Sequence, residues 1–229
     1  MKKKFLLFDV DHTLLDFSTS EKKALKKCFD DFGISLTEEI LSWYLDHNHK
    51  LWTNYENGII TRDAIFKTRF ADTFAQFSIN AHGDLMESTY REALSQGSDL
   101  IENALHTIQK LSTTHELYIV TNGLASTQEK RLKDSGLAPY FKDTFVSEIM
   151  GSQKPMIEYF DYVFNRIPDF EKKEALIIGD SLSSDIQGGI RSGIDTCWFN
   201  PEELENHTKF QPTYEIHSLL ELLPLLETN

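Results

Sequence analysis

The feature that most limits the possible folds is the run Phe5–Leu15, in which four apolar residues lead directly into Asp9 and, two positions later, Asp11. A short, continuous apolar run is typical of a strand that is buried on both faces of a sheet. In open parallel sheets, ligands bind at the carboxyl ends of the strands. Because side chains at positions i and i+2 of a strand point the same way, we expect both carboxylates to enter one pocket. A strand followed by an ordinary turn is the alternative interpretation.

Two patterns divide the rest of the chain. Residues 17–96 show only helical periodicity, whereas strands alternate with helices from residue 97 onward. We predict strands at 117–120, 143–146, 175–178 and 196–199, and helices at 101–111, 125–135, 159–167, 184–192 and 219–226. Such alternation indicates a parallel sheet with helices on both faces. The prediction is an α/β fold with a doubly wound parallel sheet, built from residues 1–16 and 97–229, and an inserted all-helical cap at 17–96.

Composition limits the classes of partner. The 229 residues carry a formal net charge of −13, whereas binding to a nucleic-acid polymer needs a basic surface. A small phosphorylated ligand needs only a few local cations, so this class stays open. No apolar stretch reaches transmembrane length, and the two cysteines, Cys28 and Cys197, suit free thiols in a reducing compartment. We expect a cytoplasmic protein, a monomer or homodimer, with no membrane partner.

Two of the later strands are followed by groups that can bind an anion. After the second strand comes Thr121-Asn122-Gly123, which offers a hydroxyl and backbone N–H groups at the start of a helix. The third strand precedes Lys154-Pro155. If the proline begins a helix, the lysine lies at a helix N-terminus, where it is unfavourable unless an anion is present. A plain helix cap and a solvated surface lysine are the ordinary interpretations of these residues.

The fourth strand ends at another pair of carboxylates. Asp180 directly follows its apolar run, and Asp185 lies at the start of the next helix, where each aspartate alone would be an ordinary helix-start residue. Parallel strands bring Asp180 to the edge of the sheet that also holds Asp9 and Asp11. Several carboxylates beside one lysine, Lys154, need a divalent cation, and ligands that are all oxygen favour Mg²⁺. The combined pattern therefore predicts a Mg²⁺-dependent phosphate site.

These residues resemble the four motifs of the haloacid dehalogenase superfamily. The motifs are matched, in order, by Asp9-Val10-Asp11-His12-Thr13-Leu14, Thr121-Asn122-Gly123, Lys154-Pro155 and Gly179-Asp180 through Asp185. The helical insertion is similar to the four-helix C1 cap of that superfamily. Nearly the whole chain resembles the pyrimidine 5'-nucleotidase family, on segments that include Leu51-Trp52, Tyr55-Glu56-Asn57-Gly58, Arg131-Leu132, Ser135-Gly136-Leu137, Gly188-Gly189-Ile190 and Thr196-Cys197-Trp198.

The resemblance implies a role for each matched residue. Asp9 would be the nucleophile that forms an aspartyl-phosphate, and Asp11 the general acid–base. The phosphoryl oxygens would be held by Thr121, Asn122, Gly123 and Lys154. Mg²⁺ would be bound by Asp9, by Asp180 and by the main-chain carbonyl of Asp11. Asp185 would lie behind these ligands or reach the ion through a water molecule. The implied substrates are nucleoside 5'-monophosphates such as UMP, dUMP and dTMP.

Several alternatives share parts of this pattern. A haloacid dehalogenase needs no metal, and its family lacks an acid at the position of Asp11. A phosphonatase needs a Schiff-base lysine in the cap. A phosphoglycolate-type phosphatase, a sugar-phosphate phosphatase or a phosphomutase has the same core residues and differs in the cap. A non-catalytic binding domain belongs to another class, and it is disfavoured because all catalytic positions are filled. Phe17 and Trp52 are the candidates for stacking on a nucleotide base.

Overall fold

The computed structural model describes residues 3–227, which lie in two compact units. Of the described residues, one unit comprises 3–17 and 98–227, and the other comprises Ser18–Gly97. Within the described residues, no helix is both long enough and apolar enough to cross a membrane. The interpretation of the second unit as a substrate cap stays a prediction.

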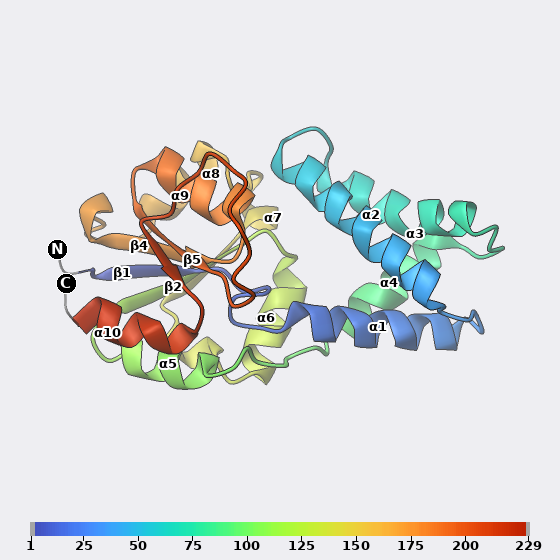
Figure 1. Ribbon diagram of the computed structural model, residues 1–229, viewed down its shortest axis with the longest axis horizontal. Helices are drawn as coiled ribbons and strands as arrows, with labels where there is room; N and C mark the ends of the chain where they lie inside the picture. Colours follow the sequence, from blue (N-terminus) through green and yellow to red (C-terminus); the bar gives the residue numbers. More distant parts are fainter. Residues whose placement is uncertain (1–2, 228–229) are drawn as a thin grey trace. The chain divides into compact units, whose positions relative to one another are not determined.

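The first unit is built on a sheet of six described strands, all parallel, in the order β3-β2-β1-β4-β5-β6 (Figure 1). The strands are β1 (Phe5–Phe8), β2 (Glu116–Thr121), β3 (Asp143–Val146), β4 (Ala175–Gly179), β5 (Asp195–Phe199) and β6 (Tyr214–Ile216). The chain adds β2 and β3 on one side of β1 and the last three strands on the other. The predicted doubly wound α/β fold is thus confirmed. The strand order changes direction between β1 and β4, and in such sheets ligands bind at this point, outside the carboxyl ends of the strands.

Alternation along the central strands supplies two separate cores. In β1, Leu6 and Phe8 face one core, and Phe5 and Leu7 face the other, which is why all four residues are buried. The first core is closed by α5 (Ala104–Leu111), α6 (Ala125–Asp134) and α10 (Leu222–Glu227). The second is closed by α8 (Ile157–Phe164) and α9 (Gln187–Ser192), which lie on the opposite face in Figure 1. The shorter elements are α7 (Ser147–Met150), 3₁₀ turns at Ala138–Tyr140, Lys172–Glu174 and Leu219–Glu221, and a π-helical turn at Leu182–Ile186.

The structure differs from the sequence-based expectations at short elements. Pro155 does not begin a helix, because α7 intervenes and α8 starts at Ile157. The helix expected at 184–192 begins as the π-helical turn Leu182–Ile186, with the Ser181 hydroxyl accepting from the Ser184 N–H at 3.2 Å. Strand β6 and helix α7 were not predicted, since three or four residues are too few to show a periodicity.

The second unit consists of α1 (Phe17–Asp31, with its first residue in the other unit), α2 (Glu38–Glu56), α3 (Arg62–Gln76) and α4 (Gly83–Leu94). Thr37 and Thr61 cap α2 and α3, each accepting a hydrogen bond of 3.2 Å from the third residue along. Aromatic side chains fill the interior; Tyr44, Phe70 and Tyr90, for example, have ring centroids 5.0 to 6.2 Å apart.

A buried polar network joins the four helices of this unit. The Arg69 guanidinium donates to both carboxylate oxygens of Glu87 at 2.7 Å. Asn48 and Tyr90 donate to Glu21 at 2.9 and 3.1 Å, and Arg69 reaches the Asn48 carbonyl oxygen at 3.4 Å. These groups are nearly inaccessible to water, so their mutual pairing is what makes their burial tolerable.

Candidate active site

The candidate site lies at the carboxyl ends of β1, β2 and β4. Asp9 immediately follows β1, and its backbone N–H donates to Ile178 O on β4 at 2.9 Å. Asp180 immediately follows β4, so the parallel register of the two strands brings both aspartates to one edge. Thr13 fixes Asp180 from the loop after β1, since its hydroxyl lies 3.2 Å from Asp180 Oδ1 and accepts from the Asp180 N–H at 3.1 Å.

Three carboxylates form a compact acidic cluster at this edge. Asp9, Asp180 and Asp185 each present an oxygen within 4.8 Å of the others. Asp185 comes from the π-helical turn, where its Oδ2 accepts from the Ser181 N–H at 3.2 Å. Gly179 provides the space, because a Cβ atom at this position would lie 2.2 Å from Asp185 Oδ2. The last residue of β4 therefore has to be a glycine for Asp185 to point into the cluster.

The Lys154 ammonium contacts two of these three carboxylates. Its Nζ donates to Asp9 Oδ1 at 2.6 Å, to Asp185 Oδ1 at 2.7 Å and to the main-chain oxygen of Val120 at 2.9 Å. The segment is held by Asn122, whose side-chain amide donates to Lys154 O and accepts from Lys154 N at 3.0 and 2.9 Å. Lys154 is 1% exposed, so the interpretation as a solvated surface lysine is wrong.

Burial and mutual repulsion perturb the carboxyl groups. Burial raises the pKa of Asp9 to about 7, although the Lys154 ammonium offsets part of that rise. Burial, followed by the charge of Asp9, raises the pKa of Asp180 to about 7, and burial raises the pKa of Asp185 to about 6. Burial alone would lower the pKa of Lys154, but Asp185 and Asp9 raise it above its ordinary value. A single lysine thus leaves negative charge unbalanced, and three converging carboxylates fit a hard divalent cation.

Asp11 has a different set of partners. The strand ends at Phe8, so the alternation expected for Asp9 and Asp11 does not continue to the second aspartate. The loop turns back on itself instead: His12 adopts a left-handed conformation, with φ of 62°. The Asp11 carboxylate accepts from Gln128 Nε2 at 2.7 Å through Oδ2 and from Arg131 Nη1 through Oδ1, both on α6. Its carboxyl group is therefore held beside the acidic cluster rather than within it.

Thr121, at the end of β2, has its hydroxyl oriented by two donors. Its Oγ1 accepts from the Gly123 N–H at 3.1 Å and from Gln128 Nε2 at 3.0 Å. A hydroxyl oxygen has two lone pairs and one proton, so these bonds leave the O–H as a donor for an anion. A Cβ atom at Gly123 would lie 2.6 Å from Gln128 Nε2, so a larger residue there would displace the Gln128 amide. The side chain of Asn122 is engaged with Lys154 instead of pointing at an anion.

Gln128 and Arg131 were not predicted as site residues, although Arg131 lies in a segment on which the resemblance to the pyrimidine 5'-nucleotidases rests. A signal for them was present in the helix 125–135. Positions 124, 127, 128, 131 and 132 recur at helical spacing, and two of these inward positions carry long polar side chains. Gln128 and Arg131 are each 1% exposed. Buried polar groups need buried partners, so such positions predict a contact with other polar residues.

The two candidates for base stacking belong to different units. Phe17 begins α1, its ring centroid lies 5.3 Å from that of His12, and the Arg131 guanidinium lies 5.6 Å from its ring. Trp52 on α2 meets the ring of Tyr55 edge to face at 5.7 Å. The hydroxyl of Tyr55 accepts from Arg62 Nη2 at 2.6 Å. Their roles in binding a base stay predictions.

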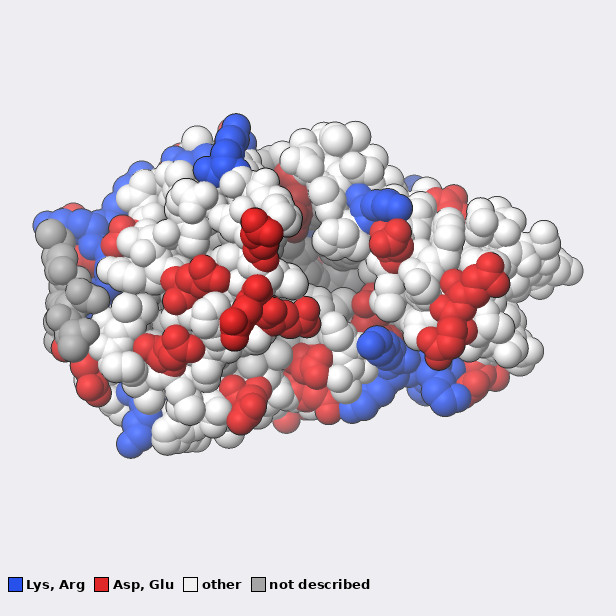
Figure 2. Space-filling view, viewed as in Figure 1, with Lys and Arg blue, Asp and Glu red and all other residues white. Residues whose placement is uncertain are grey.

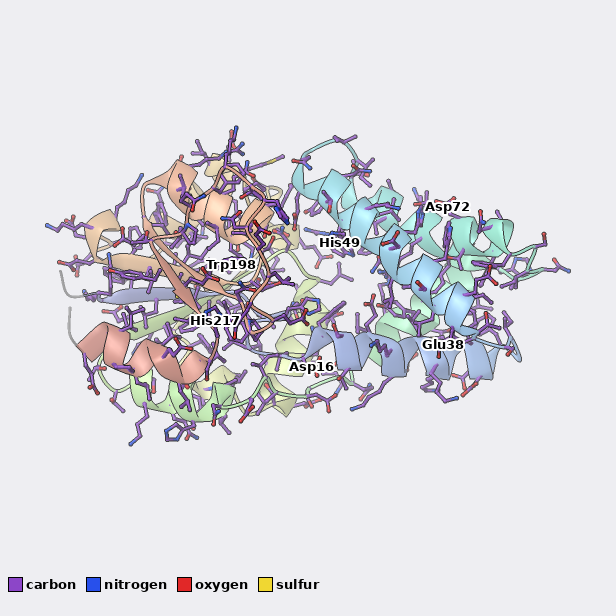
Figure 3. All side chains as sticks on the ribbon, in the orientation of Figure 1. Asp16, Glu38, His49, Asp72, Trp198 and His217 are labelled. Carbon is purple, nitrogen blue, oxygen red and sulfur yellow. The ribbon has the colours of Figure 1, made fainter. Side chains whose placement is uncertain are left out.

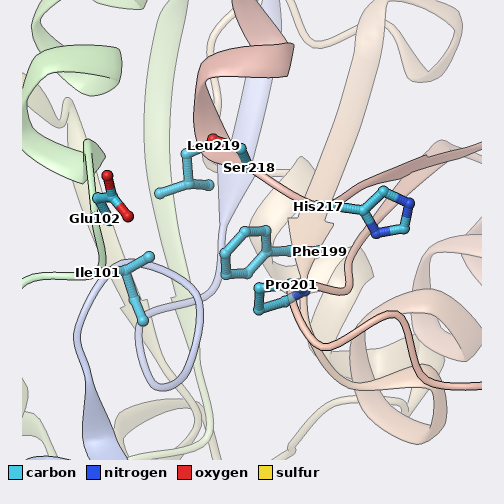
Figure 4. Close-up of a pocket in the computed structure, with 7 residues that line it drawn as sticks. All are labelled: Ile101, Glu102, Phe199, Pro201, His217, Ser218 and Leu219. Carbon is cyan, nitrogen blue, oxygen red and sulfur yellow. The ribbon is translucent and has the colours of Figure 1, made fainter.

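A hollow lies at the carboxyl ends of β5 and β6. It measures about 250 Å³ and is lined by Ile101, Glu102, Phe199, Pro201, His217, Ser218 and Leu219 (Figure 4). None of the acidic cluster lines it. Trp198, labelled in Figure 3, connects β5 to the site, since its indole N–H donates to Asp180 O at 2.8 Å. Acidic side chains are spread over this face of the unit in Figure 2, in keeping with the negative net charge.

The chain is similar to known hydrolases over nearly its whole length. Residues 6–199 match the family model of the haloacid dehalogenase-like hydrolases. The pyrimidine 5'-nucleotidase PynA of Streptococcus pneumoniae is 40% identical over 227 residues, which cover 99% of this chain and 96% of that protein. The pyrimidine 5'-nucleotidase YjjG of Escherichia coli is 31% identical and covers 99% of both. The HAD-hydrolase YfnB from Bacillus subtilis, in a magnesium-bound crystal structure, is 49% identical, with 99% of both chains covered and a TM-score of 0.95.

Proposed function

Because the chain belongs to the haloacid dehalogenase-like hydrolases, we propose that it is a Mg²⁺-dependent phosphatase acting on pyrimidine nucleoside 5'-monophosphates. One observation carries this proposal most strongly. The Lys154 ammonium binds Asp9 and Asp185 at once, within a cluster of three carboxylates at the carboxyl edge of the sheet. Such a site can receive a phosphate group between a cation and the Thr121 hydroxyl.

In the first step, a carboxylate oxygen of Asp9 attacks phosphorus. A P–O bond to Asp9 forms while the P–O bond to the ribose 5'-oxygen breaks, and Asp11 gives its proton to that oxygen, which leaves as an alcohol. Lys154 and the O–H of Thr121 stabilise the charge on the phosphoryl oxygens. The product of the step is an aspartyl-phosphate on Asp9.

In the second step, water attacks the phosphorus of the aspartyl-phosphate. Asp11, now ionised, takes a proton from the water, and the bond between phosphorus and Asp9 breaks. Inorganic phosphate leaves, Asp9 recovers its carboxylate, and Asp11 is again protonated for the next turnover. The same residue thus acts first as an acid and then as a base.

The acidic cluster supplies the ligands for the cation. Asp9, Asp180 and the main-chain carbonyl of Asp11 would hold Mg²⁺, with Asp185 behind them or joined to the ion through water. When bound, the ion offsets the unbalanced carboxylate charge and the charge of the phosphate. Asp185 meanwhile keeps Lys154 in place.

The substrate class is supported by the full-length relatives. PynA and YjjG are named as pyrimidine 5'-nucleotidases, and the similarity to them covers the helical unit as well as the α/β unit. UMP, dUMP and dTMP are therefore the proposed substrates. Phe17 and Trp52 stay the two candidates for stacking on the base.

The proposal is tested by phosphate release from a panel of phosphomonoesters with Mg²⁺ and with EDTA. The panel holds pyrimidine and purine monophosphates, phosphoglycolate and sugar phosphates. We expect the highest kcat/KM on pyrimidine monophosphates and no turnover in EDTA. A preference for phosphoglycolate or a sugar phosphate would replace the substrate class, and full activity in EDTA would refute the metal requirement. Hydrolysis of no phosphomonoester at all would point to a binding domain.

A further inference from the structure

We propose that Gln128 and Arg131 are positioning residues. Together they align Asp11, which protonates the leaving oxygen, with Thr121, which donates a hydrogen bond to the phosphate. The inference rests on the proposed phosphatase activity, because it assigns a task to these residues within that reaction. Neither residue reaches the acidic cluster, and neither would touch the phosphorus. Their action is exerted through the side chains of Asp11 and Thr121.

The amide of Gln128 is fully used at the centre of this arrangement. Its Nε2 has two hydrogens, which are donated to Asp11 Oδ2 at 2.7 Å and to Thr121 Oγ1 at 3.0 Å. Its Oε1 accepts from Arg131 Nη1 at 3.0 Å. Turning the amide over would place Oε1 against the Asp11 carboxylate, and Asp11 and Thr121 would both lose their donor. Only one orientation of the amide therefore satisfies all three hydrogen bonds.

Arg131 fixes both Gln128 and Asp11. Nη1 donates to Asp11 Oδ1 and to Gln128 Oε1, from a guanidinium that is 1% exposed. The two residues are three positions apart on α6, so they lie on the same face of that helix. Because α6 starts four residues after the end of β2, the fold carries the pair to Thr121 and to the loop after β1 together.

The orientation of the amide determines which way the Thr121 hydroxyl points. With Nε2 donating to it, Oγ1 must be an acceptor there, and its proton is left for a phosphoryl oxygen. A carboxylate at position 128 would invert this arrangement. Thr121 would then donate its proton to position 128, and the phosphate would lose a donor. The same carboxylate would repel Asp11.

These two effects have different kinetic signatures. The Thr121 hydroxyl contacts the phosphoryl group, which every substrate shares, so its loss lowers kcat/KM by the same factor for all esters. Asp11 protonates the leaving oxygen, so its misplacement matters for a nucleotide and little for p-nitrophenyl phosphate, whose leaving group needs no proton. Since kcat/KM covers events only up to departure of the leaving group, the second step does not obscure the comparison.

The experiment measures kcat/KM on dUMP and on p-nitrophenyl phosphate, with Mg²⁺, for the full-length chain. The variants are Gln128→Met, which keeps the length and loses the polar groups, and Gln128→Glu, which is nearly isosteric. Arg131→Lys keeps the positive charge and loses the planar guanidinium. Two reference variants define the signatures. Thr121→Val shows the loss of kcat/KM that all esters share, and Asp11→Asn shows the loss that is specific to the nucleotide. Glu129→Met, at an exposed position of α6, is the matched control.

We expect both Gln128 variants to lower kcat/KM on dUMP about 100-fold, the scale on which about 1 Å of misplacement acts. The loss on p-nitrophenyl phosphate should be at least about tenfold smaller. For Gln128→Glu, whose carboxylate would take the Thr121 proton, that loss should be similar to the loss caused by Thr121→Val. Arg131→Lys should also lower the ratio of kcat/KM on dUMP to kcat/KM on p-nitrophenyl phosphate. Glu129→Met should change neither substrate.

Equal losses on the two substrates, or no loss on either, would overturn the inference, because a merely structural role moves both together. Thermal unfolding shows which variants are folded, and the ratio is read from those; if every variant at positions 128 and 131 is unfolded, the residues are structural and the inference fails. Failure of the proposed function is a separate result, since the wild-type chain would then hydrolyse neither ester.

Discussion

Replacing Asp180 by asparagine should stabilise the metal-free protein at pH 8 while removing its activity. Burial and the charge of Asp9 raise the pKa of Asp180 from 3.8 to about 7. An acid whose pKa is raised in the folded state binds protons more tightly there than in the unfolded chain. Its unfavourable contribution is therefore absent below pH 4, grows as the pH rises towards 7, and is complete at pH 8.

The magnitude follows from the size of this change. One pKa unit equals about 1.4 kcal/mol, so ionised Asp180 disfavours the metal-free fold by up to about 4 kcal/mol. The carboxyl group retains some exposure to water, which screens the interaction, so we expect about 2 kcal/mol. Asparagine keeps the acceptor for the Thr13 hydroxyl, whose bond to Asp180 Oδ1 is 3.2 Å long, and it carries no charge.

The assay is urea unfolding of wild type and Asp180→Asn, in EDTA and in Mg²⁺, at pH 4 and pH 8. In EDTA at pH 8 the variant should be more stable by about 2 kcal/mol, and at pH 4, close to the ordinary pKa of an aspartate, the difference should fall to about 0.5 kcal/mol. Mg²⁺ should stabilise the wild type and change the variant far less. Asp161→Asn removes a charge from an exposed position of α8 and controls for net charge. A variant that is less stable than wild type in EDTA at pH 8 would refute the electrostatic account of the cluster.

The remaining predictions concern single side chains. Asp9→Asn should abolish phosphate release while the circular dichroism spectrum stays that of the wild type, because an amide is a poor nucleophile; turnover near wild type would contradict the proposed role. Lys154→Met should lower kcat by about 10²–10³, the effect of losing one donor to developing charge, and a normal kcat would exclude this role. Arg69→Met should destabilise the helical unit by about 3 kcal/mol, because buried Glu87 loses both of its 2.7 Å hydrogen bonds and keeps only Arg91, whose Nε lies 3.3 Å from Glu87 Oε1. A urea midpoint that matches the wild type would show that this pair contributes nothing.

The core of the fold could be predicted because its signals are long and redundant. Four apolar residues in β1 and five buried ones in β4 have no stable place except between two layers of helices. The short edge strand β6 left no such signal, since three residues at the margin of a sheet depend on their neighbour β5 rather than on their own pattern. The same holds for α7, a single helical turn.

The candidate site could be predicted as a set of residues but not as a set of contacts. Strand ends indicate which residues meet at an edge, and the structure does bring Asp9, Lys154, Asp180 and Asp185 together. Contacts made by α6 depend on how that helix is rotated over the sheet, which no local pattern around Asp11 encodes. Lys154 illustrates the same limit. Its position after β3 suggested a helix terminus, whereas its burial comes from the pairing of its backbone with Asn122.

The separation of Asp9 from Asp11 depends on where β1 stops. Had the strand continued, both side chains would have entered the acidic cluster, and the proposed general acid–base would have faced Lys154 and the proposed metal ligands. Because β1 ends at Phe8 and the loop turns at His12, Asp11 is directed to α6 instead. Its partners there, Gln128 and Arg131, are absent from the acidic cluster. Two carboxylates two positions apart can then have different tasks, because the backbone between them assigns each to a different group of neighbours.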